Sequence, residues 1–374
     1  MPKGIPDVHK AWIRRREVKV ELYEVIMAGG GGTRFWPLSR RKKPKQFVNV
    51  SGNDILLNET IIRMDKLIKR ENVYIVTNAE HQDLIRRELV NGIPFSNILT
   101  EPVGRNTAPC ILYAASVLAQ QAGDGIICVT GSDYHIQDAE EYCRIMENAA
   151  KEAEQSDCIV TIGIKPTYPA TGFGYILSGE QTGNELYKVE KFVEKPDLET
   201  AKSYLESGRY TWNSGVFVFK ASVILNAYQT YLPQMFEQMQ QIIEARGTDN
   251  QDAVLQEVYP QLESISVDYG IMEKINNMKV IPGDFGWSDV GSLDELKRFH
   301  KPDENGNICI GETICIDSQG CIASSEGRLL TLVGLEDIIA VETGDAVLVC
   351  RKDKAQDVKK AVEELKNQGK EKYL

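Results

Sequence analysis

The sequence predicts an α/β protein, in which a three-layer domain with a mostly parallel sheet is followed by a small β-rich domain. Between residues 18 and 300, short apolar runs alternate with amphipathic helical patterns, as they do in doubly wound α/β domains. At 301–307 the composition changes to Lys-Pro-Asp-Glu-Asn-Gly-Asn, which we interpret as a linker. The expected parts are therefore an N-terminal extension at 1–17, a main domain at 18–300 and a C-terminal domain at 301–374.

The expected strands are short apolar runs bounded by turn residues, a pattern typical of buried strands. In chain order they are Val25–Met27, Val73–Thr77, Ile98–Leu99, Ile126–Thr130, Cys158–Gly163, Gly174–Leu177, Leu186–Val193 and Gly215–Phe219. Helices are expected between them, where apolar residues recur on one helical face. These helices are indicated by Leu57, Ile61, Met64 and Ile68, and by the segments Thr107–Gln121, Ala139–Gln155 and Leu198–Ser207.

The C-terminal segment shows a short repeat before a final amphipathic helix at 353–367. Two sets of residues recur every six positions, Cys309, Cys315 and Cys321, and Ile310, Ile316 and Ile322. This period predicts coils of a small parallel β-helix or a related β fold. A metal site built from the three cysteines is the alternative, and it is disfavoured because zinc sites usually have closer pairs and a fourth ligand.

Charge and composition exclude several classes of protein. With 43 basic and 54 acidic residues the net charge is −11, which disfavours binding to nucleic acid or to an anionic membrane. No apolar run approaches the ~20 residues that span a bilayer, and the basic N-terminus lacks the apolar segment of a signal peptide. None of the eight cysteines forms a C-x-x-C pair, so buried, reduced thiols of a cytoplasmic protein are expected.

The most informative segment is 28–47. After Ala28 come four glycines, Gly29, Gly30, Gly31 and Gly32, and then Thr33. Glycines let the backbone approach a ligand closely, and successive free N–H groups form a nest for anions. Six basic residues follow within twelve positions: Arg34, Arg40, Arg41, Lys42, Lys43 and Lys45. This combination predicts a polyphosphate site, and a flexible turn beside a solvated basic patch is the alternative.

Spacing excludes the two commoner glycine-rich nucleotide loops. The dinucleotide pattern G-x-G-x-x-G fails because its sixth position falls on Arg34 or Phe35. The P-loop pattern fails because no Gly-Lys pair follows at the required distance. An NAD-binding oxidoreductase is therefore disfavoured.

The run Gly-Gly-Gly-Gly-Thr-Arg-Phe-Trp-Pro-Leu-Ser at 29–39, followed by Pro-Lys-Gln-Phe at 44–47, resembles the signature of the sugar-phosphate nucleotidyltransferases. Its Phe-Trp-Pro-Leu-Ser-Arg version is similar to that of the mannose-1-phosphate guanylyltransferase branch. Six or seven motifs in family order extend the resemblance over residues 22–299. It implies a Rossmann-like nucleotidyltransferase domain, GTP and mannose 1-phosphate as substrates, GDP-mannose and pyrophosphate as products, and Mg²⁺ as cofactor.

The resemblance also implies roles for the loop and its cations. Residues 28–33 would contact the nucleotide, and Arg34 would hold its β- and γ-phosphates. Lys45 would stabilise charge near the α-phosphorus.

The run E-P-x-x-R-N-T-A-P at 101–109 resembles the base-binding loop of the family. The Glu101 carboxylate can accept two hydrogen bonds from guanine, from N1–H and the 2-amino group, but it would face a lone pair on adenine N1. Asn106 and Thr107 would complete this nucleotide site. Either of them can also cap the helix that begins there, and the two roles are compatible.

Two aspartates follow predicted turns. Asp133 lies in the turn that follows the strand Ile126–Thr130, at the edge where open α/β sheets bind ligands, and a solvated turn aspartate is the alternative. Asp289 lies in Gly-Trp-Ser-Asp-Val-Gly, where a helix N-cap is the alternative. Both match the aspartates that coordinate Mg²⁺ in the family, and Mg²⁺ prefers carboxylate and phosphate oxygens.

The remaining motifs resemble the sugar-phosphate site of the family. In F-V-E-K-P, Lys195 would bind the phosphate as a point charge and Glu194 would accept hydrogen bonds from sugar hydroxyls. A charge pair between these two neighbours on the surface is the alternative. Gly172 would let the backbone touch the sugar, and Asn213 would bond a hydroxyl. For Asp268 we favour a helix N-cap.

The expected catalytic residues are thus Arg34, Lys45, Asp133, Lys195 and Asp289. Two alternatives remain open: the same chemistry with another base or sugar, such as glucose 1-phosphate, and a non-catalytic paralogue that senses sugar nucleotides. The intact charged set argues against the second. The oligomeric state is left open, a homodimer included.

Overall fold

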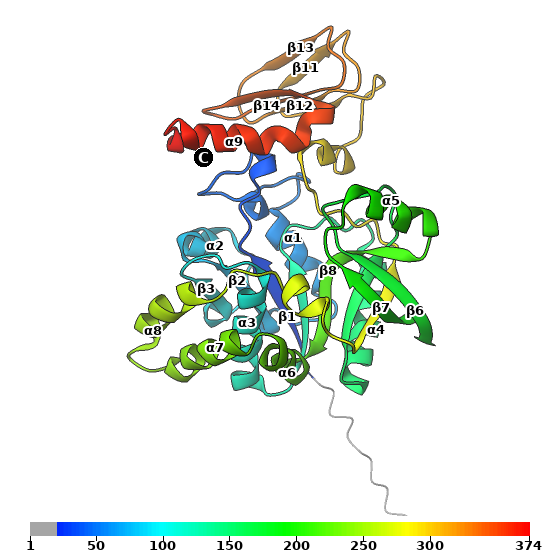
Figure 1. The fold of residues 1–374 in the computed structure, drawn as a ribbon. Coiled ribbons are helices and arrows are strands. Elements are labelled where there is room, and N and C mark those ends of the chain that lie inside the picture. The colour runs from blue at the N-terminus through cyan, green and yellow to red at the C-terminus, as the bar shows by residue number, and fades with distance from the viewer. Residues whose placement is uncertain (1–20) are drawn as a thin grey trace, which may run out of the picture.

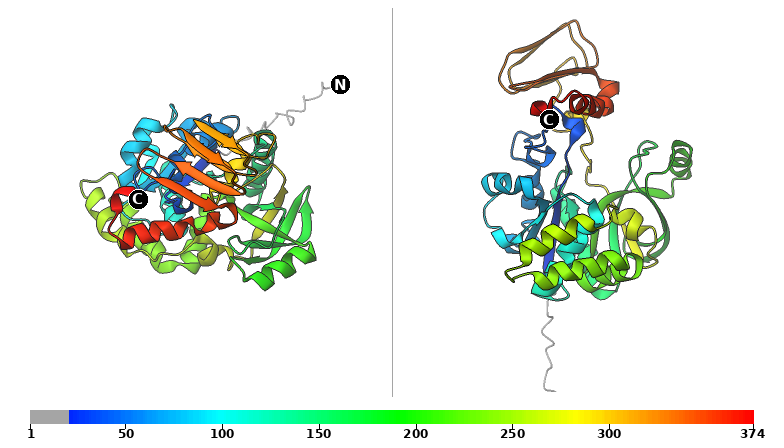
Figure 2. Two further views of the ribbon diagram at one scale, coloured as in Figure 1. Left: turned by 90° about the horizontal axis from the view of Figure 1, so that it is seen from above. Right: turned by 60° about the vertical axis from the view of Figure 1, so that its left-hand side comes forward.

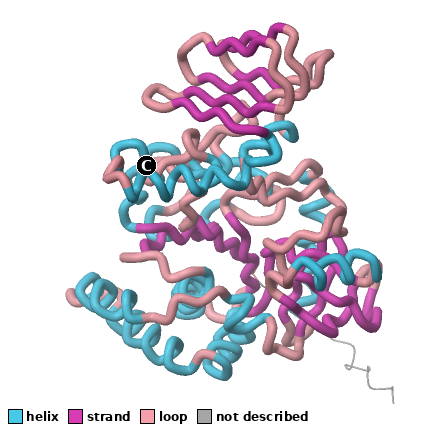
Figure 3. The backbone as a smooth tube through the Cα atoms, turned by 45° about the horizontal axis from the view of Figure 1, so that its top comes forward, coloured by secondary structure: helices cyan, strands magenta, loops and turns pink. Residues whose placement is uncertain are grey.

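The computed structural model describes residues 21–374, so the expected extension at 1–17 lies outside the described residues. A large α/β domain carries a small β-rich domain at one end, and the C-terminal helix lies between the two (Figure 1; Figure 2). Helices, strands and long loops all contribute to the region where the two parts meet (Figure 3). In the described part of the chain, no helix is long and apolar enough to span a membrane.

A nine-stranded sheet forms the middle layer of the large domain, in the order β3–β2–β1–β4–β8–β5–β9–β7–β6. The strands are β1 (Leu22–Ala28), β2 (Val73–Asn78), β3 (Ile98–Glu101), β4 (Ile126–Gly131), β5 (Ile159–Ile164), β6 (Tyr175–Gly183), β7 (Leu186–Val193), β8 (Tyr210–Lys220) and β9 (Met278–Gly283). No expected element covers β9, because Lys279 and Pro282 interrupt its apolar run.

The expected direction of the strands is confirmed. Strands β3, β2, β1 and β4 pair in parallel, and β9 is parallel to β5. Only β8 and β7 are reversed among these nine, since β8 is antiparallel to β4, β5 and β6, and β7 is antiparallel to β6 and β9. Met27 of β1 lies opposite Gly131 of β4. The loops that follow β1 and β4 therefore leave the same edge of the sheet.

Helices cover both faces of the sheet because successive strand residues point to opposite sides. Val25 packs into one apolar core and its neighbour Ile26 into the other. The first face carries α3 (Thr107–Ala122), α6 (Ala221–Tyr231), α7 (Pro233–Ala245) and α8 (Gln251–Val258). The second carries α1 (Leu56–Met64), α2 (Gln82–Glu88), α4 (Ala139–Gln155) and α5 (Leu198–Ser207). This gives the three layers that the alternating pattern predicts.

The C-terminal domain is built from short stacked strands. They are β10 (Ile308–Ile310), β11 (Thr313–Ile316), β12 (Ile322–Ser325), β13 (Leu330–Val333), β14 (Ile338–Glu342) and β15 (Val347–Arg351). Strands β10, β12 and β14 pair in parallel, as do β11 and β13, so successive coils stack as expected for a β-helix. The final helix, α9 (Val358–Asn367), is shorter than expected because a 3₁₀ turn occupies 352–357.

The six-residue spacing between Cys309 and Cys315 corresponds to the spacing between successive strands of the β-helix. Cys309 lies in β10 and Cys315 in β11, and their Sγ atoms are 3.5 Å apart. In the described residues no group of three or more His, Cys, Asp or Glu side chains could hold a metal ion. All eight thiols are free, but Cys309 is exposed and Cys315 and Cys350 are half-buried, so the expectation of buried thiols is wrong for these three.

One buried carboxyl group of the sheet is expected to make stability depend on pH. Glu24 in β1 is 1% exposed, and its Oε2 has no hydrogen-bond partner. Burial raises the pKa of Glu24 to about 8, although the Arg63 charge opposes the shift. The folded state therefore retains a proton that the unfolded chain releases from about pH 4.5 upward. The stability that this proton contributes is complete below that pH and is lost as pH rises towards 8.

Glu24→Gln should remove this loss, because an amide does not ionise. We expect the free energies of unfolding of the variant and the parent, taken from melting curves, to differ less near pH 5 than near pH 9. Near pH 9 the variant should be more stable than the parent by on the order of 3 kcal/mol. Glu21→Gln, at an exposed position just before β1, is the matched control and should give no gain at alkaline pH. Parallel pH profiles for Glu24→Gln and the parent would contradict this account.

Candidate active site

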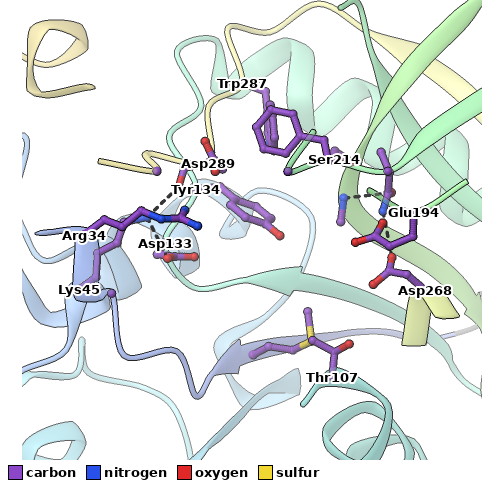
Figure 4. Close-up of a pocket in the computed structure, with 18 of the residues that line it drawn as sticks. Arg34, Lys45, Thr107, Asp133, Tyr134, Glu194, Ser214, Asp268, Trp287 and Asp289 are labelled. Atoms are coloured by element: carbon purple, nitrogen blue, oxygen red, sulfur yellow. Dashed lines mark hydrogen bonds and ion pairs between the residues drawn. The ribbon is translucent and has the colours of Figure 1, made fainter. Parts of the chain in front are cut away.

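A cavity of about 450 Å³ opens at the carboxyl ends of β1 and β4 (Figure 4). It brings together most of the predicted site residues, although they come from segments far apart in the chain. These are Gly32, Thr33, Arg34, Lys45, Thr107, Asp133, Gly172, Glu194, Asn213 and Asp289. The predicted residues outside its lining are Ala28, Gly29, Gly30, Gly31, Glu101, Asn106 and Lys195.

The glycine loop begins where β1 ends. Ala28 is buried, and its carbonyl accepts hydrogen bonds from Gln46 Nε2 at 2.8 Å and Thr77 Oγ1 at 3.1 Å. Gly30 and Gly31 are exposed, and a Cβ added at either would have no neighbour within 4 Å, so their backbone is open to a ligand. Gly32 has φ 58°, and a Cβ there would collide with the Lys45 side chain. Glycine is required at this position for both reasons.

Lys45 is the buried cation of the cavity. It opens a 3₁₀ turn, Lys45–Phe47, and is 5% exposed. Its Nζ lies 2.9 Å from Asp133 Oδ2 and donates to the backbone carbonyl of Asp289 at 2.7 Å. Arg34, in the 3₁₀ turn Thr33–Phe35, remains exposed at the mouth of the same cavity.

The other four cations of the basic segment do not line this cavity, which corrects the expectation that the whole group serves a polyphosphate. Arg40 donates to the Tyr373 carbonyl and pairs with Asp345 at 2.6 Å, so it binds the C-terminal domain. Arg41 pairs with Glu80, and Lys42 and Lys43 are exposed.

Asp133 and Asp289 lie on two loops that are tied to each other. His135 N–H donates to the Ser288 carbonyl at 2.9 Å, and Ser288 N–H donates back at 3.0 Å. Burial raises the pKa of Asp289; the Lys45 ammonium opposes the shift, and the Asp133 carboxylate adds to it. Among the described residues, no side chain or backbone N–H donates to the Asp289 carboxylate, so it is free to bind a ligand.

This donor set fits a divalent cation of the hard type. Two carboxylates from different loops face one end of the cavity, and no third carboxylate, histidine or cysteine completes a cage within residues 21–374. Mg²⁺ is commonly held in this way, by one or two carboxylates together with water and substrate phosphates.

The opposite side of the cavity is polar and carries two more carboxyl groups. Asn213 Nδ2 donates to Asp268 Oδ1 at 3.0 Å, and Glu194 lines the same wall. Burial raises the pKa of Asp268 to about 7, and the Glu194 charge adds to the shift. The interpretation of Asp268 as a helix N-cap is wrong. It is the first residue of a π-helix, Asp268–Met272, and its carboxyl group bonds Asn213 and lines the cavity.

Lys195 lies in an adjoining cavity that shares Arg34, Gly172 and Asp289 with the first. Its Nζ is 2.9 Å from Glu194 Oε1, and its side chain is 51% exposed. Its backbone has φ 46°, an uncommon conformation for a residue other than glycine. Lys195 therefore pairs with Glu194 in a cavity that also reaches Arg34 and Asp289.

The predicted base loop has a more buried geometry than the rest of the site. Glu101 is 3% exposed, and Tyr259 OH donates to its Oε1. Burial raises the pKa of Glu101 to about 7, and the Tyr259 hydrogen bond opposes the shift. A Cβ added at Gly29 would lie 3.4 Å from Glu101 Oε2, so this oxygen faces the glycine loop. Asn106 caps α3 by accepting from Thr107 N–H at 2.9 Å, and Thr107 Oγ1 accepts from Val267 N–H.

A protein-family model described as nucleotidyl transferase matches residues 23–306, the part of the chain that carries this cavity. The chain belongs to the nucleotidyl transferase family. A second model, described as a mannose-phosphate isomerase/GMP-like beta-helix domain, matches residues 311–365 and agrees with the stacked strands of the C-terminal domain.

Named relatives resemble nearly all of this nucleotidyl transferase. The mannose-1-phosphate guanylyltransferase of Escherichia coli K12 is 38% identical over 94% of this chain and 75% of its own length. The xanthan biosynthesis protein XanB of Xanthomonas campestris strain B100 is 40% identical over 93% of this chain and 74% of its own length. The crystal structure of a Thermus thermophilus protein named mannose-1-phosphate geranyltransferase aligns with a TM-score of 0.84 at 32% identity, covering 93% of this chain and all of that one.

These comparisons confirm the resemblance that the signature at 29–47 indicates, and with it the fold class. The chain is therefore a nucleotidyltransferase. Family members join a nucleoside triphosphate to a sugar 1-phosphate and generally use a divalent metal.

Proposed function

We propose that the protein converts GTP and mannose 1-phosphate into GDP-mannose and pyrophosphate. The observation that carries this proposal is the two-sided cavity. Arg34, Lys45, Asp133 and Asp289 gather on one side, and Glu194 and Asp268 lie across from them (Figure 4). The first side suits phosphates and a metal ion, and the second offers acceptors for sugar hydroxyls. The guanylyltransferase relatives support guanine as the base and mannose as the sugar.

The reaction needs no general base, because a sugar phosphate is already an anionic nucleophile near pH 7. An oxygen of mannose 1-phosphate attacks the α-phosphorus of GTP in line. The bond from the α-phosphorus to the bridging oxygen breaks, and its electron pair leaves with pyrophosphate. The protein therefore acts by positioning the two substrates and neutralising their charge.

Each charged residue has a proposed part in this transfer. Arg34 and the N–H groups of the glycine loop bind the β- and γ-phosphates, and Lys45 stabilises charge around the α-phosphorus. Lys195 docks the phosphate of the incoming sugar, and Glu194, Asn213 and the backbone at Gly172 hold the sugar. Asp133 and Asp289 hold Mg²⁺, which when bound supplies further neutralisation of phosphate charge.

The direct test is pyrophosphate release across a matrix of nucleoside triphosphates and sugar 1-phosphates in the presence of Mg²⁺. We expect the pair GTP and mannose 1-phosphate to give the highest kcat/KM. A higher value for another pair, such as one with glucose 1-phosphate, would reassign the substrate within the family. No turnover with any pair would favour a sensing paralogue.

Base selection gives a second test, at Glu101. GTP should exceed ATP in kcat/KM by roughly ten- to a few-hundred-fold, because adenine would offer no donor to the buried carboxylate and would leave it with the Tyr259 hydroxyl alone, at a cost of about 1–3 kcal/mol or more. ITP keeps N1–H but lacks the 2-amino group, so it should fall between them. Because the pKa of Glu101 is raised to about 7, the GTP:ATP ratio should increase as pH rises through 7 and the carboxylate forms.

Glu101→Gln should narrow the GTP:ATP ratio and remove its dependence on pH. Tyr259→Phe is the matched control, because it deletes the hydroxyl that donates to Glu101 but keeps the carboxylate. This variant should keep a clear preference for GTP. An unchanged ratio in Glu101→Gln would move base recognition to backbone groups or to Asn106.

A further inference from the structure

A lysine of the C-terminal domain also lines the active-site cavity. Lys359, in the first turn of α9, shares this cavity with Arg34, Lys45 and Asp289 of the large domain. Helix α9 packs on the 3₁₀ turn that carries Arg34. The views of the fold agree that α9 lies between the β-helix and the large domain (Figure 1; Figure 2).

Apolar packing and hydrogen bonds hold α9 in this position. Val358 and Val362 belong to one buried apolar cluster with Phe35 and Trp36, the residues that follow Arg34. Beside the helix, Trp36 Nε1 donates to the Tyr373 carbonyl at 2.7 Å. Further contacts join the segment before α9 to the loop that carries Asp289, where Gln356 Nε2 donates to Ser292 Oγ at 2.8 Å. The place of Lys359 is therefore set by packing on both sides of the phosphate site.

The charge of Lys359 has no partner within residues 21–374. The neighbouring Lys354 and Lys360 both pair with Asp357, at 3.7 and 2.8 Å, whereas Lys359 makes no ion pair. The first turn of α9 holds no acidic residue. A cation there lies at the positive end of the helix dipole, which is locally unfavourable. An anion bound in the cavity would compensate both the charge of Lys359 and the partial positive charge at the start of α9.

We propose that Lys359 binds the terminal phosphates of the nucleoside triphosphate and the departing pyrophosphate, so that the C-terminal domain completes the active site. The ligand named here rests on the proposed function. Lys45 already forms an ion pair with Asp133 and is buried at one end of the cavity. Arg34 and Lys359 are both exposed cations of its lining, and the turn of Arg34 packs against α9. The two would bind the terminal phosphates together, where the charge on the triphosphate is greatest.

Lys359→Ala tests this proposal against Lys360→Ala, an exposed neighbour on the same helix that is outside the cavity lining. In the full-length protein, calorimetric titration with magnesium pyrophosphate should show roughly five- to fifty-fold weaker binding for Lys359→Ala, within the range of one charge-assisted contact. The KM for GTP should rise, and the KM for mannose 1-phosphate should stay the same. Lys359→Arg should restore most of the affinity, and Lys360→Ala should match the parent.

Equal pyrophosphate affinity in Lys359→Ala and Lys360→Ala would overturn the proposal, as would a defect confined to mannose 1-phosphate. Failure of the proposed function gives a different result. If the parent does not use GTP and mannose 1-phosphate but Lys359→Ala still weakens pyrophosphate binding, the role of Lys359 stands and the substrates are reassigned. If the parent turns over and Lys359→Ala binds pyrophosphate normally, the substrates stand and the role of Lys359 fails.

Discussion

Asp133→Asn and Asp289→Asn are each expected to lower kcat by roughly 10²- to 10⁴-fold, because a neutral amide is a poor ligand for Mg²⁺ and a bound metal ion supplies several kcal/mol of charge stabilisation. Both carboxylates lie at the end of the cavity where Lys45 is buried. Chelation of divalent metal should likewise abolish turnover of the parent. Steady-state kinetics at saturating GTP and mannose 1-phosphate measures both effects.

The two variants should differ in stability, which separates a lost ligand from a lost fold. Asp133→Asn removes the ion pair with Lys45 at 2.9 Å and leaves a buried ammonium less compensated, so its Tm should fall. Asp289→Asn removes a carboxylate that burial disfavours, so its Tm should equal or exceed that of the parent. An inactive but fully stable Asp289→Asn is thus the decisive result.

The exposed Asp249, which lines neither cavity, offers a control, since Asp249→Asn should keep near-normal kcat. Full activity of Asp289→Asn, or of the parent after chelation of divalent metal, would contradict the proposed metal site. Activity restored in Asp289→Asn by a higher concentration of Mg²⁺ would support it, because a weakened site fills again by mass action.

Several of the site residues that the sequence predicts lie in loops that follow strands. An apolar run ending at Met27 and another ending at Thr130 indicate parallel strands, and the loops that follow parallel strands lie at one edge of the sheet. The glycine loop and Asp133 therefore meet as expected. Lys45 is predicted from the local signature at 44–47. Its ion pair with Asp133 places it at the same edge of the sheet.

Residues placed by long-range packing are beyond such local patterns. Asp268 reaches the cavity through an irregular π-helical turn, whose position depends on packing against the large apolar core. Tyr259 meets Glu101 across 158 positions of the chain. Lys359 depends on how α9 packs against Phe35, and the basic segment alone does not show that Arg40 binds Tyr373. Each of these contacts joins two segments that are far apart in the chain. The periodicity of a segment predicts its own helix or strand, but it does not predict which other segment it will contact.

Lys195→Ala is expected to raise the KM for mannose 1-phosphate by roughly ten- to a hundred-fold and to change the KM for GTP little. The expected rise follows from the loss of a hydrogen bond to a charged group, which costs about 1.5–3 kcal/mol. Lys195 pairs with Glu194, and the lining of its cavity includes none of the four loop glycines. Arg34→Ala should instead lower kcat, because its charge matters most as pyrophosphate departs. Initial rates with each substrate varied in turn separate the two defects.

Part of the Lys195→Ala defect should come from its ion-pair partner. Without Lys195, the Glu194 carboxylate is left nearly buried beside the incoming phosphate and repels it. The double variant Lys195→Ala with Glu194→Gln should therefore recover part of the KM, whereas Lys191→Ala, an exposed lysine on β7, should change nothing. If Lys195→Ala leaves the KM for mannose 1-phosphate unchanged, the docking role is wrong. The sugar phosphate would then be held by Arg34, which lines both cavities.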